Sequence, residues 1–124
     1  MAWLAVAAGG AIGSVLRYGL GLLANQPAWP WGTWIVNVLG SFLIGFFMVI
    51  GKEQGSWSPQ LYLLLTTGML GGFTTFSTLS LEATTYILQG QWLRGLLYLV
   101  SSVALGLAAA WLGIWLARQM FAQG

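Results

Sequence analysis

A run of glycines, aromatic residues and hydroxyl residues interrupts the third hydrophobic stretch of this chain. The run begins with Gly71 and Gly72, continues through Thr74 and Thr75, and carries no charge. Paired glycines and adjacent β-branched residues each raise the free energy of a continuous helix. Backbone that leaves the helix at membrane depth persists only where it is buried in protein or lines a polar path. The run therefore predicts a helix break over residues 71–76, with a functional site at the break.

Hydrogen-bond donors dominate the polar side chains of the hydrophobic stretches. Amide, hydroxyl and guanidinium groups donate to anions, and the rings of acidic residues that line cation pores are absent. The electropositive ring edge of Phe76 also suits an anion. Backbone carbonyls freed by the break at Gly71 and Thr74 suit a hard cation such as Na⁺, so both kinds of ion stay open. The donors are Arg17, Asn37, Thr74, Thr75, Ser77, Thr78 and Tyr98.

Two other hydrophobic stretches place polar and small residues on one helix face. The first face carries Asn37, Ser41 and Gly45, and the second carries Tyr98, Ser102 and Gly106 at the same spacing. An amide inside a membrane helix must face protein or water, so Asn37 is either a site residue or a hydrogen bond between helices. The hydroxyls of Tyr98 and Ser102 either form a track of donors or serve packing.

Two charged residues lie inside predicted helices. Arg17 is deep enough in the first stretch to act at a site, although its long side chain can also reach the nearest membrane surface. Glu82 lies in the second half of the third stretch and approaches the surface. We interpret Glu82 as a vestibule residue or a salt-bridge partner.

The composition of the chain places it in a membrane. Of its 124 residues, 58% are hydrophobic and 5% are charged, and the mean hydropathy is +0.82. A soluble domain carries roughly a quarter of charged residues. The four basic and two acidic residues form no basic face for nucleic acid. Cys and His are absent, so the chain has no set of residues for thiolate or general acid–base catalysis. We therefore expect that the protein is not an enzyme.

Four hydrophobic stretches reach the length of about 20 residues that a membrane helix needs. They cover approximately residues 3–23, 33–50, 59–88 and 92–117. The loops between them are too short for a second domain. We therefore expect one all-α integral membrane domain over residues 1–124, with four transmembrane helices in the lipid bilayer and the third broken near its middle. Small residues, among them Gly9, Gly13 and Gly45, predict close helix packing.

The charges give the chain little reason to insert in one orientation. Four spans put Lys52 and Arg118 on one side of the membrane and Arg94 on the other, toward which Arg17 also lies, near the end of the first helix. The positive charge that normally sets orientation is therefore almost balanced. Four short helices also hardly enclose a polar path alone. Our hypothesis is a dual-topology protein that pairs as an antiparallel dimer.

Three motifs, in order along the chain, resemble the Fluc (CrcB) family of fluoride channels. The motifs read GGAIGSVLRY over residues 9–18, GT followed by NVLGSF and a further glycine over residues 32–45, and GGFTTFST over residues 71–78. The third motif is highly specific, and the likeness covers essentially the whole chain.

The resemblance implies a passive, fluoride-selective channel in the cell membrane of a prokaryote, where it lowers cytoplasmic fluoride and its toxicity. It also implies an antiparallel homodimer with two pores and a structural sodium ion at the dimer centre. By this likeness, Asn37 donates to fluoride and Arg17 attracts anions into a vestibule. The implied fluoride-pore residues are Asn37, Phe76, Ser77, Thr78, Tyr98 and Ser102, and the implied sodium ligands are the carbonyls of Gly71 and Thr74.

Two positions depart from the family pattern. Members usually carry a second phenylalanine where this chain has Leu79, and often a third hydroxyl where it has Gly106. Leucine has no ring quadrupole, so an edge-on anion contact is lost at that position. Leu79 either slows conduction or marks one half of a heterodimer whose partner supplies the ring.

Two other functions are alternatives. A small proton-coupled multidrug exporter has a similar size but needs a buried carboxylate in its first helix, where this chain has Arg17 and no acid. A non-transporting membrane scaffold explains the small-residue faces but not the interrupted third helix.

Overall fold

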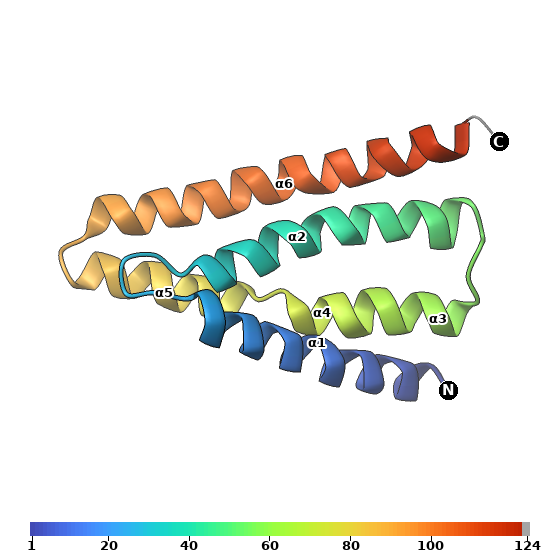
Figure 1. Cartoon of the computed structure of the whole chain (residues 1–124), viewed down its shortest axis with the longest axis horizontal. Coiled ribbons are helices and arrows are strands. Elements are labelled where there is room, and N and C mark those ends of the chain that lie inside the picture. The colour runs from blue at the N-terminus through green and yellow to red at the C-terminus, as the bar shows by residue number, and fades with distance from the viewer. Residues whose placement is uncertain (123–124) are drawn as a thin grey trace.

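The computed structural model describes residues 1–122, which form four long helical segments lying roughly along one axis (Figure 1). No β-strand is formed within these residues, so the predicted all-α class is confirmed for the described part of the chain. The elements are α1 (Ala2–Ala24), α2 (Trp31–Met48), the π-helical turn η1 (Val49–Glu53), α3 (Pro59–Leu63), the π-helical turn η2 (Leu64–Leu70), α4 (Gly71–Phe73), α5 (Phe76–Leu88) and α6 (Trp92–Ala122).

Three of the segments are single helices long and apolar enough to cross a membrane. They are Ala2–Ala24, Trp31–Glu53 and Trp92–Ala122. The second and the last extend past the predicted ends at residues 50 and 117, because polar residues continue both helices beyond the apolar stretch. At that end Arg118 Nε donates to Glu53 Oε2 (3.1 Å). The start of α1 and the end of α6 lie at this same end of the bundle, together with the loop from η1 to α3 (Figure 1).

The break in the third segment lies at Thr74 and Thr75, beyond the glycines. Gly71 and Gly72 are helical, so the prediction that the break begins at residue 71 is wrong. Thr74 (φ −85°, ψ 156°) and Thr75 (φ −152°, ψ 121°) are extended, a conformation that suits β-branched residues. The helix resumes because the Thr75 hydroxyl accepts a hydrogen bond from the Thr78 amide (3.1 Å) and so caps α5.

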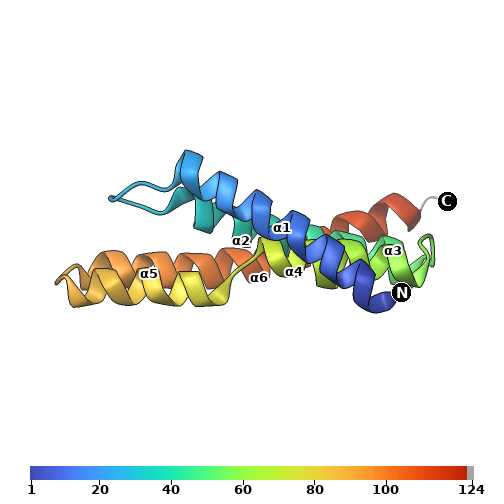
Figure 2. The same ribbon diagram turned by 90° about the horizontal axis from the view of Figure 1, so that it is seen from below.

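The glycines of this region instead allow α1 to pack closely against the third segment. A Cβ atom at Gly72 would lie 2.6 Å from the carbonyl oxygen of Gly10, and one at Gly13 would overlap the carbonyl oxygen of Met69. Side chains other than hydrogen do not fit at such distances. The small residues predicted to form close-approach faces in the first helix, Gly9 and Gly13, therefore pack within the chain itself, where α1 crosses η2 and α4 (Figure 2).

Helices α2 and α6 run parallel and side by side along most of their length (Figure 1). Glycines on both helices fix their register. A Cβ atom at Gly45 would overlap the carbonyl oxygen of Ala110, and one at Gly113 would overlap that of Phe42. This register decides which polar residues of the two helices are neighbours.

Candidate functional site

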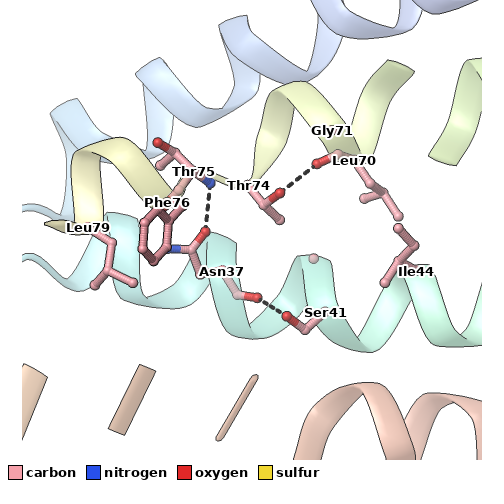
Figure 3. Close-up of a pocket in the computed structure, with 10 residues that line it drawn as sticks. Asn37, Ser41, Ile44, Leu70, Gly71, Thr74, Thr75, Phe76 and Leu79 are labelled. Atoms are coloured by element: carbon pink, nitrogen blue, oxygen red, sulfur yellow. Dashed lines mark hydrogen bonds between the residues drawn. The ribbon is translucent and has the colours of Figure 1, made fainter. Parts of the chain in front are cut away.

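Asn37 of α2 holds the broken backbone of the third segment with two hydrogen bonds (Figure 3). Its Nδ2 donates to the carbonyl oxygen of Thr75 (3.0 Å), and its Oδ1 accepts from the amide of Thr75 (2.8 Å). The side chain thus pairs both backbone groups of a residue that has left the helix. Nδ2 carries a second N–H, which has no hydrogen-bond partner within residues 1–122. Asn37 therefore joins α2 to the third segment by hydrogen bonds, and it keeps one N–H of Nδ2 free to donate.

The break also leaves the carbonyl oxygens of Gly71 and Thr74 without a hydrogen bond within the described residues. In a continuous helix they would accept from the amides of Thr75 and Thr78. The Thr75 amide donates to Asn37 instead, and the Thr78 amide donates to the Thr75 hydroxyl. Free carbonyl oxygens are the ligands that a hard cation prefers. The backbone at the break therefore fits a small cation such as Na⁺.

The helix ends that meet at the break carry partial charges of opposite sign. The helical run of residues 59–73 ends there, so its last carbonyl groups carry partial negative charge. Helix α5 begins at Phe76 and runs for 13 residues, so its first N–H groups carry partial positive charge. Discontinuous helices in transporters use these two ends for cations and for anions, respectively. One break can therefore favour a cation at the carbonyl groups that end the run of residues 59–73 and an anion at the N–H groups that begin α5.

A cavity of about 280 Å³ lies at the break, between α2 and the third segment (Figure 3). Its lining contains Asn37, Ser41, Gly71, Thr74 and Phe76 and no charged residue. It therefore brings together several of the predicted pore and cation residues. The cavity is open on one face of the molecule, where Phe76 is 76% exposed. The described residues thus leave this cavity without a wall on that face.

The predicted pore residues of α6 do not line this cavity, and Tyr98 packs against Leu79 and Ala83 of α5. Tyr98 is completely buried, and its hydroxyl donates to Oε1 of Glu82 (3.2 Å). Ser102 is 4% exposed, and its hydroxyl has no hydrogen-bond partner within residues 1–122. A buried hydroxyl without a partner costs about 1–3 kcal/mol unless a water or ligand meets it. The Ser102 hydroxyl is therefore a group that a small polar ligand can satisfy.

Glu82 forms no ion pair within the part of the chain that the structure describes. The ion pair found within residues 1–122 joins Arg118 and Glu53, at the other end of the bundle. The salt-bridge interpretation of Glu82 is therefore wrong for the described residues. Glu82 instead accepts from Tyr98 and lines an open cavity of about 360 Å³ near the turn between α1 and α2.

Arg17 and Thr78 line a further cavity of about 280 Å³, beside α1. Nε of Arg17 donates to the carbonyl oxygen of Gly72 (3.1 Å), which keeps the guanidinium beside α4. Its other N–H groups have no hydrogen-bond partner within residues 1–122. The structure thus places a positive charge and a hydroxyl together, one short helical turn from the break.

Ser77 and Leu79 occupy different environments at the start of α5. Ser77 is exposed, with its hydroxyl 3.4 Å from that of Thr75. Leu79 is 5% exposed and packs against Ala83 and Tyr98 in the subunit core, at the edge of the cavity (Figure 3). The position at which the family pattern has a second phenylalanine is therefore buried, whereas the ring of Phe76 on the same cavity is exposed.

The sequence analysis missed Thr33, which belongs to the same polar face as Asn37 and Ser41. Thr33 is 4% exposed; its amide donates to Oδ1 of Asn25, and its hydroxyl accepts from Nδ2 of Asn25. It also lines the cavity of Arg17. The signal was available, because Thr33 precedes Asn37 by four residues and continues the spacing of that face.

Comparison with known proteins gives concordant matches over most of the chain. Residues 4–114 match the sequence model of the family described as CrcB-like protein, Camphor Resistance (CrcB). A protein of Rhizobium meliloti (strain 1021) named Fluoride-specific ion channel FluC is 50% identical over 120 residues, which cover 94% of this chain and 96% of the relative. Proteins with the same name from Roseiflexus sp. (strain RS-1) and Hyphomonas neptunium (strain ATCC 15444) are 48% and 46% identical. Their matches cover 93% and 97% of this chain and 95% and 98% of the relatives.

The family match accounts for the motifs of all three predicted helices at once. Together with three helices of membrane-spanning length and apolarity, it identifies a multi-pass protein of the cell membrane. The chain belongs to the CrcB-like family.

Proposed function

We propose that this chain is a passive, fluoride-selective channel that lets accumulated fluoride leave the cytoplasm and so lowers its toxicity. The observation that carries the proposal is the break at Thr74 and Thr75, where a free donor of Asn37 and the start of α5 meet an uncharged, open cavity. The relatives named Fluoride-specific ion channel FluC support the same function. The lining of this cavity offers donors and no acidic group, which favours an anion over a cation.

Fluoride is small and strongly hydrated, so a narrow pore must replace its water with fixed donors. Asn37 supplies an N–H, and Phe76 offers an electropositive ring edge on the open face. The unpartnered hydroxyl of Ser102 supports a polar path along α6. The residues that we assign to the fluoride path are Asn37, Phe76, Ser77, Thr78, Tyr98 and Ser102. Larger halides are excluded by the width of such a path.

We assign Arg17 to a vestibule that attracts anions. Its guanidinium lines a cavity with Thr78, and the bond to Gly72 holds it in place. A positive charge in a cleft with low-dielectric walls raises the local concentration of anions. Arg17 would therefore raise the rate at which fluoride enters, without coordinating the ion along the whole path.

The functional unit in this proposal is an antiparallel homodimer. Support comes from the cavity, which lacks a wall on the face where Phe76 is exposed, and from the nearly balanced charges of the two membrane sides. A second copy inserted in the opposite direction would close that wall. A heterodimer is the alternative, because Leu79 gives a homodimer no second ring at this position.

The same proposal includes a structural sodium ion that is not transported. The carbonyl oxygens of Gly71 and Thr74 would hold it where two subunits meet, and their lack of hydrogen bonds supports this assignment. No group of three or more His, Cys, Asp or Glu side chains that could hold a metal occurs within residues 1–122. A bound cation would neutralise the negative helix ends and keep the break rigid.

The test is fluoride efflux from liposomes that contain this chain alone, in sodium buffer without a proton gradient. A potassium carrier compensates the charge, and a fluoride electrode records release. We expect efflux from the parent chain, none of chloride, and near-silence for Asn37→Asp. Transport that strictly requires a proton gradient would indicate an exporter. A folded, dimeric protein without efflux would indicate a scaffold.

A further inference from the structure

The polar face of α6 loses its side chain at Gly106. Tyr98 and Ser102 precede it on that face at intervals of four residues, and each carries a hydroxyl. A Cβ atom at Gly106 would have a single heavy-atom neighbour within 4 Å, the hydroxyl oxygen of Ser41 at 3.4 Å. That distance is ordinary van der Waals contact. Gly106 therefore leaves an open space beside α6, and the nearest group facing it is a hydroxyl of α2.

Ser41 also borders the cavity at the helix break. It is half-buried, one turn beyond Asn37 on the same face, and both residues line that cavity (Figure 3). Its hydroxyl donates to the carbonyl oxygen of Asn37 (2.7 Å). That carbonyl lies inside α2, where it also accepts the amide four residues on, so the bond from the hydroxyl is an additional, local one. The hydroxyl can therefore turn toward another acceptor while the helix stays intact.

We propose that Ser41 coordinates fluoride in the pore, and that the missing side chain at Gly106 is what gives the ion access to its hydroxyl. The inference rests on the proposed channel function and extends it to two residues outside the assigned path. The row of donors then leaves α6 after Ser102 and continues on α2 at Ser41. The register of the two helices supports this crossing, because the neighbouring pair Gly45 and Ala110 is also in contact.

The test compares fluoride efflux from liposomes for the parent chain, Ser41→Ala, Gly106→Ser and the variant with both changes. Ser41→Ala removes one hydrogen bond to a charged ion, so we expect a rate about 10- to 100-fold lower. Gly106→Ser adds a Cβ atom that fits without overlap, and its hydroxyl lies one bond beyond, beside the same space. We expect the double variant to regain efflux to within about threefold of the parent, since the added hydroxyl replaces the lost one.

Thr85→Ala is the matched control. Thr85 has the same kind of bond as Ser41, from its hydroxyl to the carbonyl oxygen of Leu81 (2.7 Å), but it lies outside the cavity at the break. We expect it to conduct at the parental rate. Parental efflux from Ser41→Ala, or a double variant as slow as Ser41→Ala, would overturn the role of Ser41 while the channel function stands. A parent chain that passes no fluoride would overturn both.

Discussion

Replacing Asn37 with Asp changes one atom type at the helix break and keeps the shape of the side chain. One carboxylate oxygen can still accept from the Thr75 amide, as Oδ1 does at 2.8 Å. The other would stand where Nδ2 now donates, 3.0 Å from the Thr75 carbonyl oxygen. The change removes a hydrogen bond worth about 0.5–1.5 kcal/mol and leaves an unpaired carbonyl at a cost of about 1–3 kcal/mol. We expect the free energy of unfolding to fall by about 2–4 kcal/mol.

The effect on conduction should be larger than the effect on stability. The variant loses the free N–H that meets the anion, which costs about 1.5–3 kcal/mol for a bond to a charged group. It also adds a negative charge beside the path. Two like charges about 4 Å apart repel by roughly 4 kcal/mol at an effective dielectric constant near 20. That term alone lowers the rate roughly a thousandfold, so fluoride efflux should fall below detection.

Two measurements on the same samples separate conduction from folding. Fluoride efflux from liposomes gives the rate, and thermal unfolding in detergent gives the stability. Trp34→Phe is the matched control on the same helix, because it removes the bond from Trp34 Nε1 to the Ser101 hydroxyl (3.0 Å) at a cost of about 1 kcal/mol. It should lower stability and keep efflux. Parental efflux from Asn37→Asp would refute the donor role, and equal loss of efflux in both variants would reduce Asn37 to a structural bond.

Three further predictions follow from the packing and from the free carbonyl groups. Replacing sodium with a large organic cation on both sides of the liposome should abolish fluoride efflux, because the free carbonyls at the break then lack their ion; unchanged efflux argues against a sodium site. Gly13→Ala places a Cβ atom into the Met69 carbonyl oxygen, so the yield of folded protein in size-exclusion chromatography should fall sharply. The control Gly19→Ala adds a Cβ atom that meets no atom within 4 Å, so this variant should express normally. Leu79→Phe adds volume beside Tyr98, and should lower the free energy of unfolding by about 1–3 kcal/mol in thermal unfolding; a stabilised variant would show that this position does not face the subunit core.

The sequence predicts the helical segments well because their apolar length is a local property. It also predicts that the third segment is interrupted, but places the start of the break at Gly71. Low helix propensity suggested that position, yet Gly71 and Gly72 are helical. Propensity is a weak term that tertiary packing overrides. At Gly72 the deciding contact is the backbone of Gly10, more than sixty positions away in the sequence and invisible to any local pattern.

At the candidate site, too, the sequence predicts which residue types are important but not which residues they contact. Residue types alone indicate that Asn37 must be hydrogen-bonded, but not that its partner is the backbone of Thr75. The motif likewise marks Leu79 as unusual without showing that its side chain packs against Ala83. Such pairings depend on helix register, which is set by glycine contacts between distant segments. The chemical groups of the site can therefore be predicted from the sequence, but their arrangement in space cannot.

The interlocked glycines of α2 and α6 give the proposed pore a wall that cannot slide. Gly45 sits on the carbonyl of Ala110 and Gly113 on that of Phe42, so each helix is keyed into the backbone of the other at two levels. Moving either helix by a fraction of a turn would drive backbone into backbone. A wall of this kind keeps the pore at a constant width, which selects ions by size, and it lacks a hinge about which the two helices could move to gate the pore. We therefore expect the channel to stay open whenever it is folded, with the flow of ions set only by their concentrations and the membrane potential.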